Sequence, residues 1–163
     1  MTTFGATVLW EKQDSEPFTD NKYSRAHVWQ FDGGAEVPAS SSPHIVRVPF
    51  SEPANVDPEE AFVASLASCH MLFFLSIAAK KGFVVRQYRD AAEGELAKNE
   101  GGRLYVSRVT LKPGITYVGT APDRDTEAGI HHEAHEQCFI ANSVLTHVVV
   151  EAVQGAREEQ DDA

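Results

Sequence analysis

Cysteine is scarce in this sequence, since its 163 residues include only Cys69 and Cys138. Two cysteines are too few for the disulfide framework of a small secreted domain. The N-terminus also lacks the basic segment and apolar run of a secretory signal. Clusters of lysine and arginine are missing, and the net charge is −10 at pH 7. Because such clusters bind nucleic acids, we expect no nucleic-acid partner. Because the sequence has no secretory signal and only two cysteines, we expect a cytoplasmic protein.

Charged residues are absent from the run Ala61 to Ala79. The run follows Asp-Pro-Glu-Glu and precedes Lys-Lys-Gly, residues that favour the beginning and the end of a helix. The sequence therefore predicts one long helix over residues 57–82. Such a helix is long enough to cross a membrane, but it is rich in alanine and serine and contains His70. We expect no membrane insertion and predict that this helix is the centre of a domain.

Strand patterns flank the long helix on both sides, which predicts the α+β class. A helix that is apolar all round must be covered on every side. The sheet of one chain covers one face of it, and the second helix covers part of another. We therefore expect a second subunit, with antiparallel sheets packed around the long central helix. One domain should span residues 1–155, followed by an acidic, disordered tail at 156–163. The predicted elements are strands at 6–13, 24–31 and 44–50, a hairpin over 83–99 and 103–119, a helix at 123–140 and a strand at 144–153; residues 35–43 are predicted as a loop with a short strand start.

The two cysteines lie in the two predicted helices, Cys69 at the centre of the uncharged run and Cys138 near the end of the second. A lone cysteine commonly packs as an ordinary buried side chain. Two thiols also permit a redox cycle, in which peroxide oxidises a thiolate to a sulfenic acid and a second thiol converts it to a disulfide. An external dithiol then resets the pair. Spacing along the chain leaves both interpretations open.

The segment PEEAFVASLASCHMLFFL, followed later by HEQCFIANSVL and a final strand, resembles the OsmC/Ohr family of thiol-dependent hydroperoxide reductases. The order of elements is similar from about residue 6 to 153. The resemblance implies an OsmC-like fold, an intertwined homodimer, and two active sites at its interface. It also implies that Cys69 attacks organic hydroperoxides, with hydrogen peroxide as a further candidate, and that Cys138 resolves the product. A dithiol reductant such as a lipoyl protein would suffice, without a cofactor.

The same family uses a glutamate at the helix start and an arginine from the N-terminal strands to hold the thiolate and the peroxide. Glu59 and Arg25 occupy the matching positions, with Arg47 as the alternative arginine. Ten helical residues rise about 15 Å, so Glu59 would reach the Cys69 of a partner helix and not its own. The ordinary interpretations are a helix-dipole residue for the glutamate and a solvated charge for the arginine. The chain departs from the family pattern at Phe139, where proline is common.

Other residues leave alternatives open. His70 follows Cys69, but neighbouring helical side chains point about 100° apart, so we expect a hydrogen-bonded core or interface histidine. The group His131, His132 and His135, followed by Cys138, has the spacing of a transition-metal site, although we predict no metal because no carboxylate motif accompanies it. An alternative function is a non-catalytic dimer that binds an apolar ligand. Four residues are candidates to line an apolar pocket or to form ordinary core: Phe62, Leu66, Phe73 and Phe74.

Overall fold

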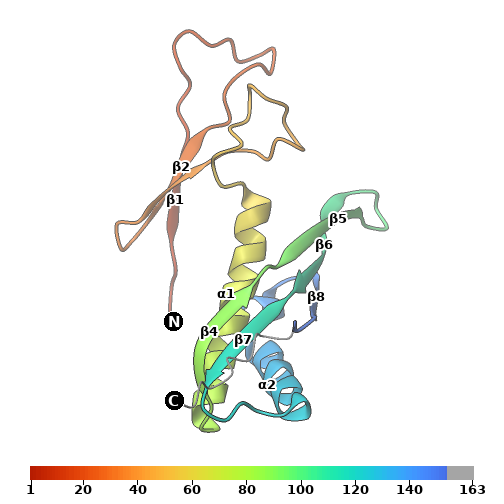
Figure 1. The fold of residues 1–163 in the computed structure, drawn as a ribbon. Helices are drawn as coiled ribbons and strands as arrows, with labels where there is room; N and C mark the ends of the chain where they lie inside the picture. Colours follow the sequence, from red (N-terminus) through yellow and green to blue (C-terminus); the bar gives the residue numbers. More distant parts are fainter. Residues whose placement is uncertain (154–163) are drawn as a thin grey trace, which may run out of the picture. The chain divides into compact units, whose positions relative to one another are not determined.

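A computed structural model describes residues 1–153 of the chain (Figure 1). The predicted acidic tail at 156–163 lies outside the described residues. The chain divides into two compact units, Met1–Ala61 and Phe62–Ala163. Helix α1 (Pro58–Lys80) begins in the first unit and continues through the second. The presence of both helices and strands confirms the predicted α+β class.

The first unit contains a three-stranded antiparallel sheet with the strand order β1 (Ala6–Leu9), β2 (His27–Phe31) and β3 (Glu36–Ala39). The strands predicted at 6–13 and 24–31 are confirmed, and each is shorter than predicted. A tight turn joins β2 to β3. Gly34 in this turn has φ +88°, a backbone conformation that favours glycine.

The strand predicted at residues 44–50 is wrong, because this segment forms turns. The N–H groups of Ile45 and Val46 donate to the carbonyl of Ser42 at 3.0 and 2.9 Å. The hydroxyl of Ser42 also accepts from the N–H of His44 at 3.2 Å. These local bonds satisfy backbone groups that a strand would have to pair with a neighbour. The third strand is β3, within the stretch predicted as a loop with a short strand start.

Helix α1 begins and ends where the sequence predicts. The carboxylate of Asp57 accepts from the N–H of Glu60 at 2.8 Å, and the carboxylate of Glu60 accepts from the N–H of Asp57 at 3.1 Å. This reciprocal capping box satisfies free donors at the helix start. At the other end Gly82 has φ +85°, and the N–H of Phe83 donates to the carbonyl of Ala78 at 3.0 Å. That pattern is a Schellman motif, which requires a left-handed residue such as glycine.

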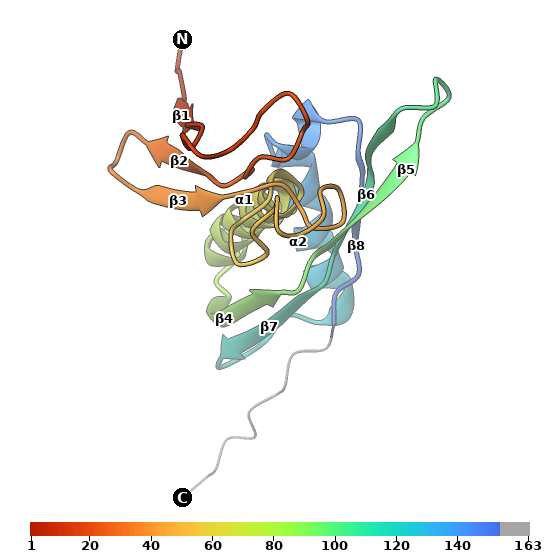
Figure 2. The same cartoon turned by 90° about the horizontal axis from the view of Figure 1, so that it is seen from above.

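The second unit contains the predicted long hairpin, divided into two paired segments. Strand β4 (Val84–Asp90) pairs antiparallel with β7 (Pro113–Val118), and β5 (Glu93–Lys98) pairs antiparallel with β6 (Leu104–Leu111). Because β4 leads into β5 and β6 into β7, both views show one long bent ribbon (Figures 1 and 2).

The last strand departs from the prediction of antiparallel sheets. Strand β8 (His147–Val150) pairs with β6 in parallel, with Arg108 opposite His147. A parallel pair needs a long crossover connection, and helix α2 (Arg124–Gln137) lies in this connection. The helix predicted at 123–140 and the strand predicted at 144–153 are both confirmed, with shorter bounds.

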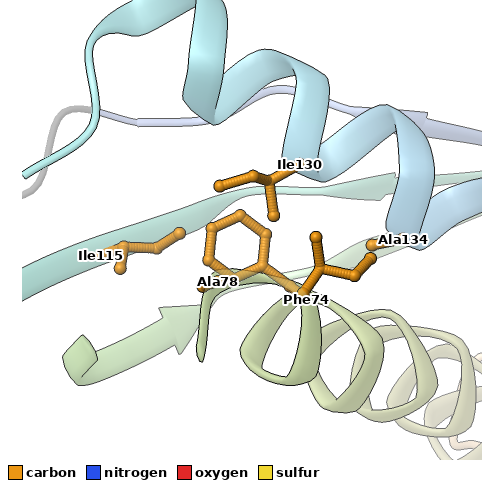
Figure 3. Close-up of a cluster of buried hydrophobic side chains, with 6 residues drawn as sticks. Phe74, Ala78, Ile115, Ile130 and Ala134 are labelled. Carbon is orange, nitrogen blue, oxygen red and sulfur yellow. The ribbon is translucent and has the colours of Figure 1, made fainter. Parts of the chain in front are cut away.

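Two apolar clusters form the core of the second unit. One joins α1, β7 and α2, and Figure 3 shows its side chains pointing toward one another. The other lies between α1 and the β5–β6–β8 sheet. The first cluster consists of Phe74, Ile77, Ala78, Ile115, Ile130 and Ala134, and the second of Leu66, Val109 and Leu111.

Helix α1 is buried along one face in a single chain. Its buried side chains follow the helical repeat, with Leu66, His70 and Phe74 spaced four residues apart. The helix also has the length and composition of a membrane span, a property that core helices of soluble proteins share. The opposite face is exposed and uncharged, and it consists of Ala64, Ser65, Ser68, Leu72 and Ser76.

Candidate functional site

Cys69 lies in the middle of α1 as a free, half-buried thiol. It follows Leu66 by three residues and precedes His70, and both of these neighbours are buried. Its side chain therefore lies at the border between the buried and the exposed faces of the helix. A thiol at such a border is shielded in part from water and still accessible to a small molecule.

Cys138 is a fully buried free thiol that directly follows α2. The prediction that it lies inside this helix is wrong by one residue, because its backbone is extended (φ −66°, ψ 109°). Its N–H donates to the carbonyl of His135 at 3.3 Å. Its Sγ accepts from the N–H of Ala141 at 3.4 Å. The turn after α2 thus holds Cys138 through its backbone N–H and through its sulfur.

The two thiols, which come from distant segments of the second unit, lie near each other. The predicted approach of the two sulfurs is confirmed, and both are free thiols in this structure. Burial, and then the hydrogen bond with Cys69, raises the pKa of Cys138 to about 11. Cys138 therefore stays protonated at neutral pH.

Glu59 and Arg25 both belong to the first unit. Glu59 is half-buried in the first turn of α1, but its neighbour Glu60 forms the capping box with Asp57. Ten residues of continuous helix separate Glu59 from Cys69 along α1. The role predicted for Glu59 in holding a thiolate and a peroxide stays a prediction.

The guanidinium of Arg25 is engaged within its own loop. One nitrogen donates to the backbone carbonyls of Asn21 and Tyr23, and the other donates to the side-chain oxygen of Asn21 at 2.9 Å. The same group lies over the ring of Tyr23, 3.7 Å from its centre. The competing arginine, Arg47, is exposed in a turn. The choice of Arg25 as a site residue therefore also stays a prediction.

The structure confirms the prediction for His70 as a core histidine and gives no support to the alternative of a metal site at the histidines of α2. His70 is buried and hydrogen-bonded to His131 at 3.0 Å, as expected for a core histidine. Because His131 faces His70, the residues that have the spacing of a metal site are not brought together as a set of ligands. Among residues 1–153, no group of three or more histidine, cysteine, aspartate or glutamate side chains is arranged to hold a metal ion.

The apolar candidates divide between core and surface. Leu66 and Phe74 are buried in the two apolar clusters. Phe73, one turn after Cys69, meets Phe139 edge-on with ring centres 5.1 Å apart. Phe139 is 72% exposed and directly follows Cys138. Phe139, a departure from the family pattern, thus makes a contact that spacing along the chain does not indicate.

The geometry defines a class of protein: an α+β chain with two free thiols near each other, one at the middle of a central helix and one after a second helix. The comparisons agree with this class. The model of the family described as OsmC-like protein matches residues 51–153, and the chain belongs to this family. No curated protein matches the sequence.

Solved structures extend the likeness over almost the whole chain. An OsmC-like protein of unknown function from Vibrio cholerae is 56% identical, with a TM-score of 0.92, covering 94% of this chain and 100% of its own. An OsmC-like protein from Mycoplasma pneumoniae is 14% identical (TM-score 0.68, 95% and 99% covered). An organic hydroperoxide resistance protein from Elizabethkingia anophelis is also 14% identical (TM-score 0.66, 96% and 98% covered). The OsmC-like fold predicted from the sequence is confirmed.

Proposed function

We propose that this protein is a thiol-dependent peroxidase that reduces organic hydroperoxides through Cys69 and Cys138. One observation carries the proposal: two free thiols from distant segments lie near each other, and the buried one stays protonated. Family membership supports the same chemistry, because structures with this fold include organic hydroperoxide resistance proteins.

The cycle assigns a different step to each thiol. The thiolate of Cys69 attacks the outer oxygen of the peroxide, which leaves an alcohol and a sulfenic acid on Cys69. The thiol of Cys138 then displaces the hydroxyl group as water and forms a disulfide. An external dithiol, such as a lipoyl protein, restores both thiols by exchange. Sulfur carries out all the redox chemistry in this scheme, and the reducing cytoplasm is the compartment that suits it.

A homodimer would complete this site. The exposed face of α1 is uncharged and rich in small residues, which suits packing against a second copy of the same helix. In such a pair, Glu59 of one chain and Cys69 of the other come within reach, and Arg25 would pair with the carboxylate and bind the peroxide. Sedimentation at micromolar concentration should therefore give twice the monomer mass of 17.9 kDa. A monomer in solution would contradict the dimer.

The decisive experiment is stopped-flow oxidation of the reduced protein by cumene hydroperoxide and by hydrogen peroxide. The wild type should react quickly and faster with the organic peroxide, whereas Cys69→Ser should not react above the buffer rate. The variant Cys138→Ser should still be oxidised once, but should stop at the sulfenic acid, which dimedone traps.

The same experiment separates the catalytic function from its alternative. A non-catalytic dimer that binds an apolar ligand should keep its activity after alkylation of Cys69, and its thiols should react no faster than free cysteine. If the wild type and Cys69→Ser show the same rate with both peroxides, the peroxidase proposal is lost.

A further inference from the structure

Two buried imidazoles link helix α1, which contains Cys69, to helix α2, which Cys138 directly follows. Nε2 of His70 in α1 lies 3.0 Å from Nδ1 of His131 in α2, and the ring planes are nearly parallel, 9° apart. His70 is 1% exposed and His131 is 5% exposed. The ring of Phe74 covers His131, with centres 4.4 Å apart. This is a hydrogen bond in the core, between residues 61 positions apart in sequence.

Both imidazoles are neutral at physiological pH. Burial, assisted by the charges of His131 and His135, lowers the pKa of His70 to about 4, and burial lowers the pKa of His131 to about 4. One of the two facing nitrogens therefore carries a hydrogen and donates the hydrogen bond, and the other nitrogen accepts it. The outer nitrogens, Nδ1 of His70 and Nε2 of His131, have no hydrogen-bond partner in this structure. The pair thus has one directional bond, and that bond joins α1 to α2.

The position of this bond relates it to both sulfurs. His70 is the residue after Cys69, and His131 precedes Cys138 by seven residues, which is two helical turns. The neighbouring α1–α2 contacts, such as Phe74 against Ile130, are apolar and therefore have little directional preference. A directional bond in the same interface fixes how far one helix slides or rotates against the other.

We propose that the His70–His131 hydrogen bond holds α2 at the setting from which Cys138 reaches the oxidised sulfur of Cys69. The two histidines are positioning residues for the second step, which rests on the function proposed above. In that step the S–O bond of the Cys69 sulfenic acid breaks, the S–S bond forms, and the hydroxyl leaves as water with the proton of Cys138. A disulfide requires Cα atoms within about 4.4–6.8 Å, so a small shift of α2 would slow this step.

The test compares two apolar variants, His70→Leu and His131→Leu, and the double variant with both. Losing one buried partner should destabilise the fold, whereas replacing both with apolar groups should restore much of the stability. Disulfide formation should nevertheless be about tenfold slower in all three, the change expected when one buried hydrogen bond is lost. Oxidation of Cys69 itself, followed by dimedone trapping, should keep its wild-type rate.

A second readout does not depend on peroxidase activity. The Cys69–Cys138 disulfide is equilibrated with glutathione redox buffers after diamide oxidation, and its reduction potential is measured. A tenfold loss in the effective concentration of the two thiols corresponds to a potential about 30 mV less negative. His70→Gln, whose amide can donate or accept near the position of Nε2, should restore most of the wild-type potential. The exposed His132→Gln is the matched control and should behave as the wild type.

Two results would overturn the positioning role. One is a folded double variant that forms the disulfide at the wild-type rate and potential. The other is a parallel fall in Cys69 oxidation and disulfide formation, which would show that the pair only maintains the fold. If peroxide oxidises no thiol in the wild type, the proposed function fails, and the glutathione equilibrium still decides whether the histidines position the sulfurs.

Discussion

The two units of the chain are stabilised in different ways. In the second unit, large apolar side chains such as Phe74, Leu66 and Ile130 are fully buried. In the first unit, the buried side chains are small or polar, and they are Ala39, Ser40, Ser42, Ser51 and Asp57. The second unit therefore has the hydrophobic core of an independent domain, whereas the first depends mainly on its hydrogen bonds.

The first unit also exposes large apolar residues. Its aromatic cluster of Trp10, Phe18 and Tyr23 is in ring contact, with Phe18 and Tyr23 stacked 4.6 Å apart, but Phe18 remains 49% exposed. Strand β1 is exposed along its whole length. Such a surface fits the proposed homodimer, in which a second chain would cover it. The predicted α+β class is therefore correct for this chain, although its first unit has no hydrophobic core of its own.

Truncating a core aromatic should give the largest difference between the units. Phe74→Ala should lower the free energy of unfolding by about 3–5 kcal/mol, because it leaves a cavity between α1, β7 and α2. The matched variant Phe18→Ala in the first unit should cost about 1 kcal/mol or less, since that ring is half exposed. Urea unfolding measures both, and equal losses would contradict the contrast.

Acid should destabilise the second unit through its buried imidazoles. The pKa of His70 and of His131 is about 4 in the folded state, against 6.5 for the free side chain. Between these values the unfolded state binds more protons, so stability falls as pH falls from about 6.5 toward 4, and it is unaffected above that range. The loss by pH 5 should be about 2 kcal/mol for each imidazole.

Urea unfolding at pH 8 and pH 5 measures this loss. The control is the double variant His70→Leu with His131→Leu, in which most of the difference between the two pH values should disappear. A double variant with the full wild-type difference would show that other groups cause the acid sensitivity.

Alanine substitutions at one glycine of each unit should destabilise the protein for two different reasons. A Cβ on Gly94 in β5 would lie 2.6 Å from a methyl group of Val63 in α1, so Gly94→Ala should cost about 1–3 kcal/mol through overpacking. A Cβ on Gly34 would meet no atom within 4 Å, so Gly34→Ala should cost about 1 kcal/mol through its positive φ. In a Val63→Ala background, Gly94→Ala should cost less free energy of unfolding, because the clashing methyl group is gone. The cost of Gly34→Ala should be the same in both backgrounds. Thermal unfolding of the four variants would test this difference.

The smallest effect should come from the capping box. Asp57→Ala removes the acceptor for the N–H of Glu60 and should cost about 1 kcal/mol. Asp57→Ser keeps an acceptor at the same position and should recover most of that loss. Circular dichroism during thermal unfolding measures both variants. A loss in Asp57→Ala no larger than that in Asp57→Ser would mean that the cap contributes little to this helix.

Local signals in the sequence predicted the local features of the fold. The start of α1 at Asp57 and its end at Gly82 each depend on residues within a few positions of one another, and both are confirmed. The strand at 44–50 failed because its alternating pattern competes with the bonding of Ser42 to the following backbone, which the pattern does not reveal.

Contacts between residues far apart in the sequence were the features of the candidate site that the sequence predicted least well. The resemblance paired Cys69 with Cys138, and the structure brings them together. The sequence did not indicate that His131 is the partner of His70, because hydrogen bonds across 61 residues leave no local pattern. The parallel pairing of β8 was missed for the same reason.

The parallel strand has a consequence for incomplete chains. Strand β8 covers one edge of β6 from Arg108 to Leu111, and the N–H of Glu151 continues this edge by donating to the carbonyl of Leu111 at 2.8 Å. A polypeptide that stops after Ser143 would retain both cysteines, yet it would leave that edge open. Open strand edges recruit other chains. Premature termination or proteolytic clipping of about twenty residues should thus yield an aggregating product that still contains every sulfur atom of the proposed cycle.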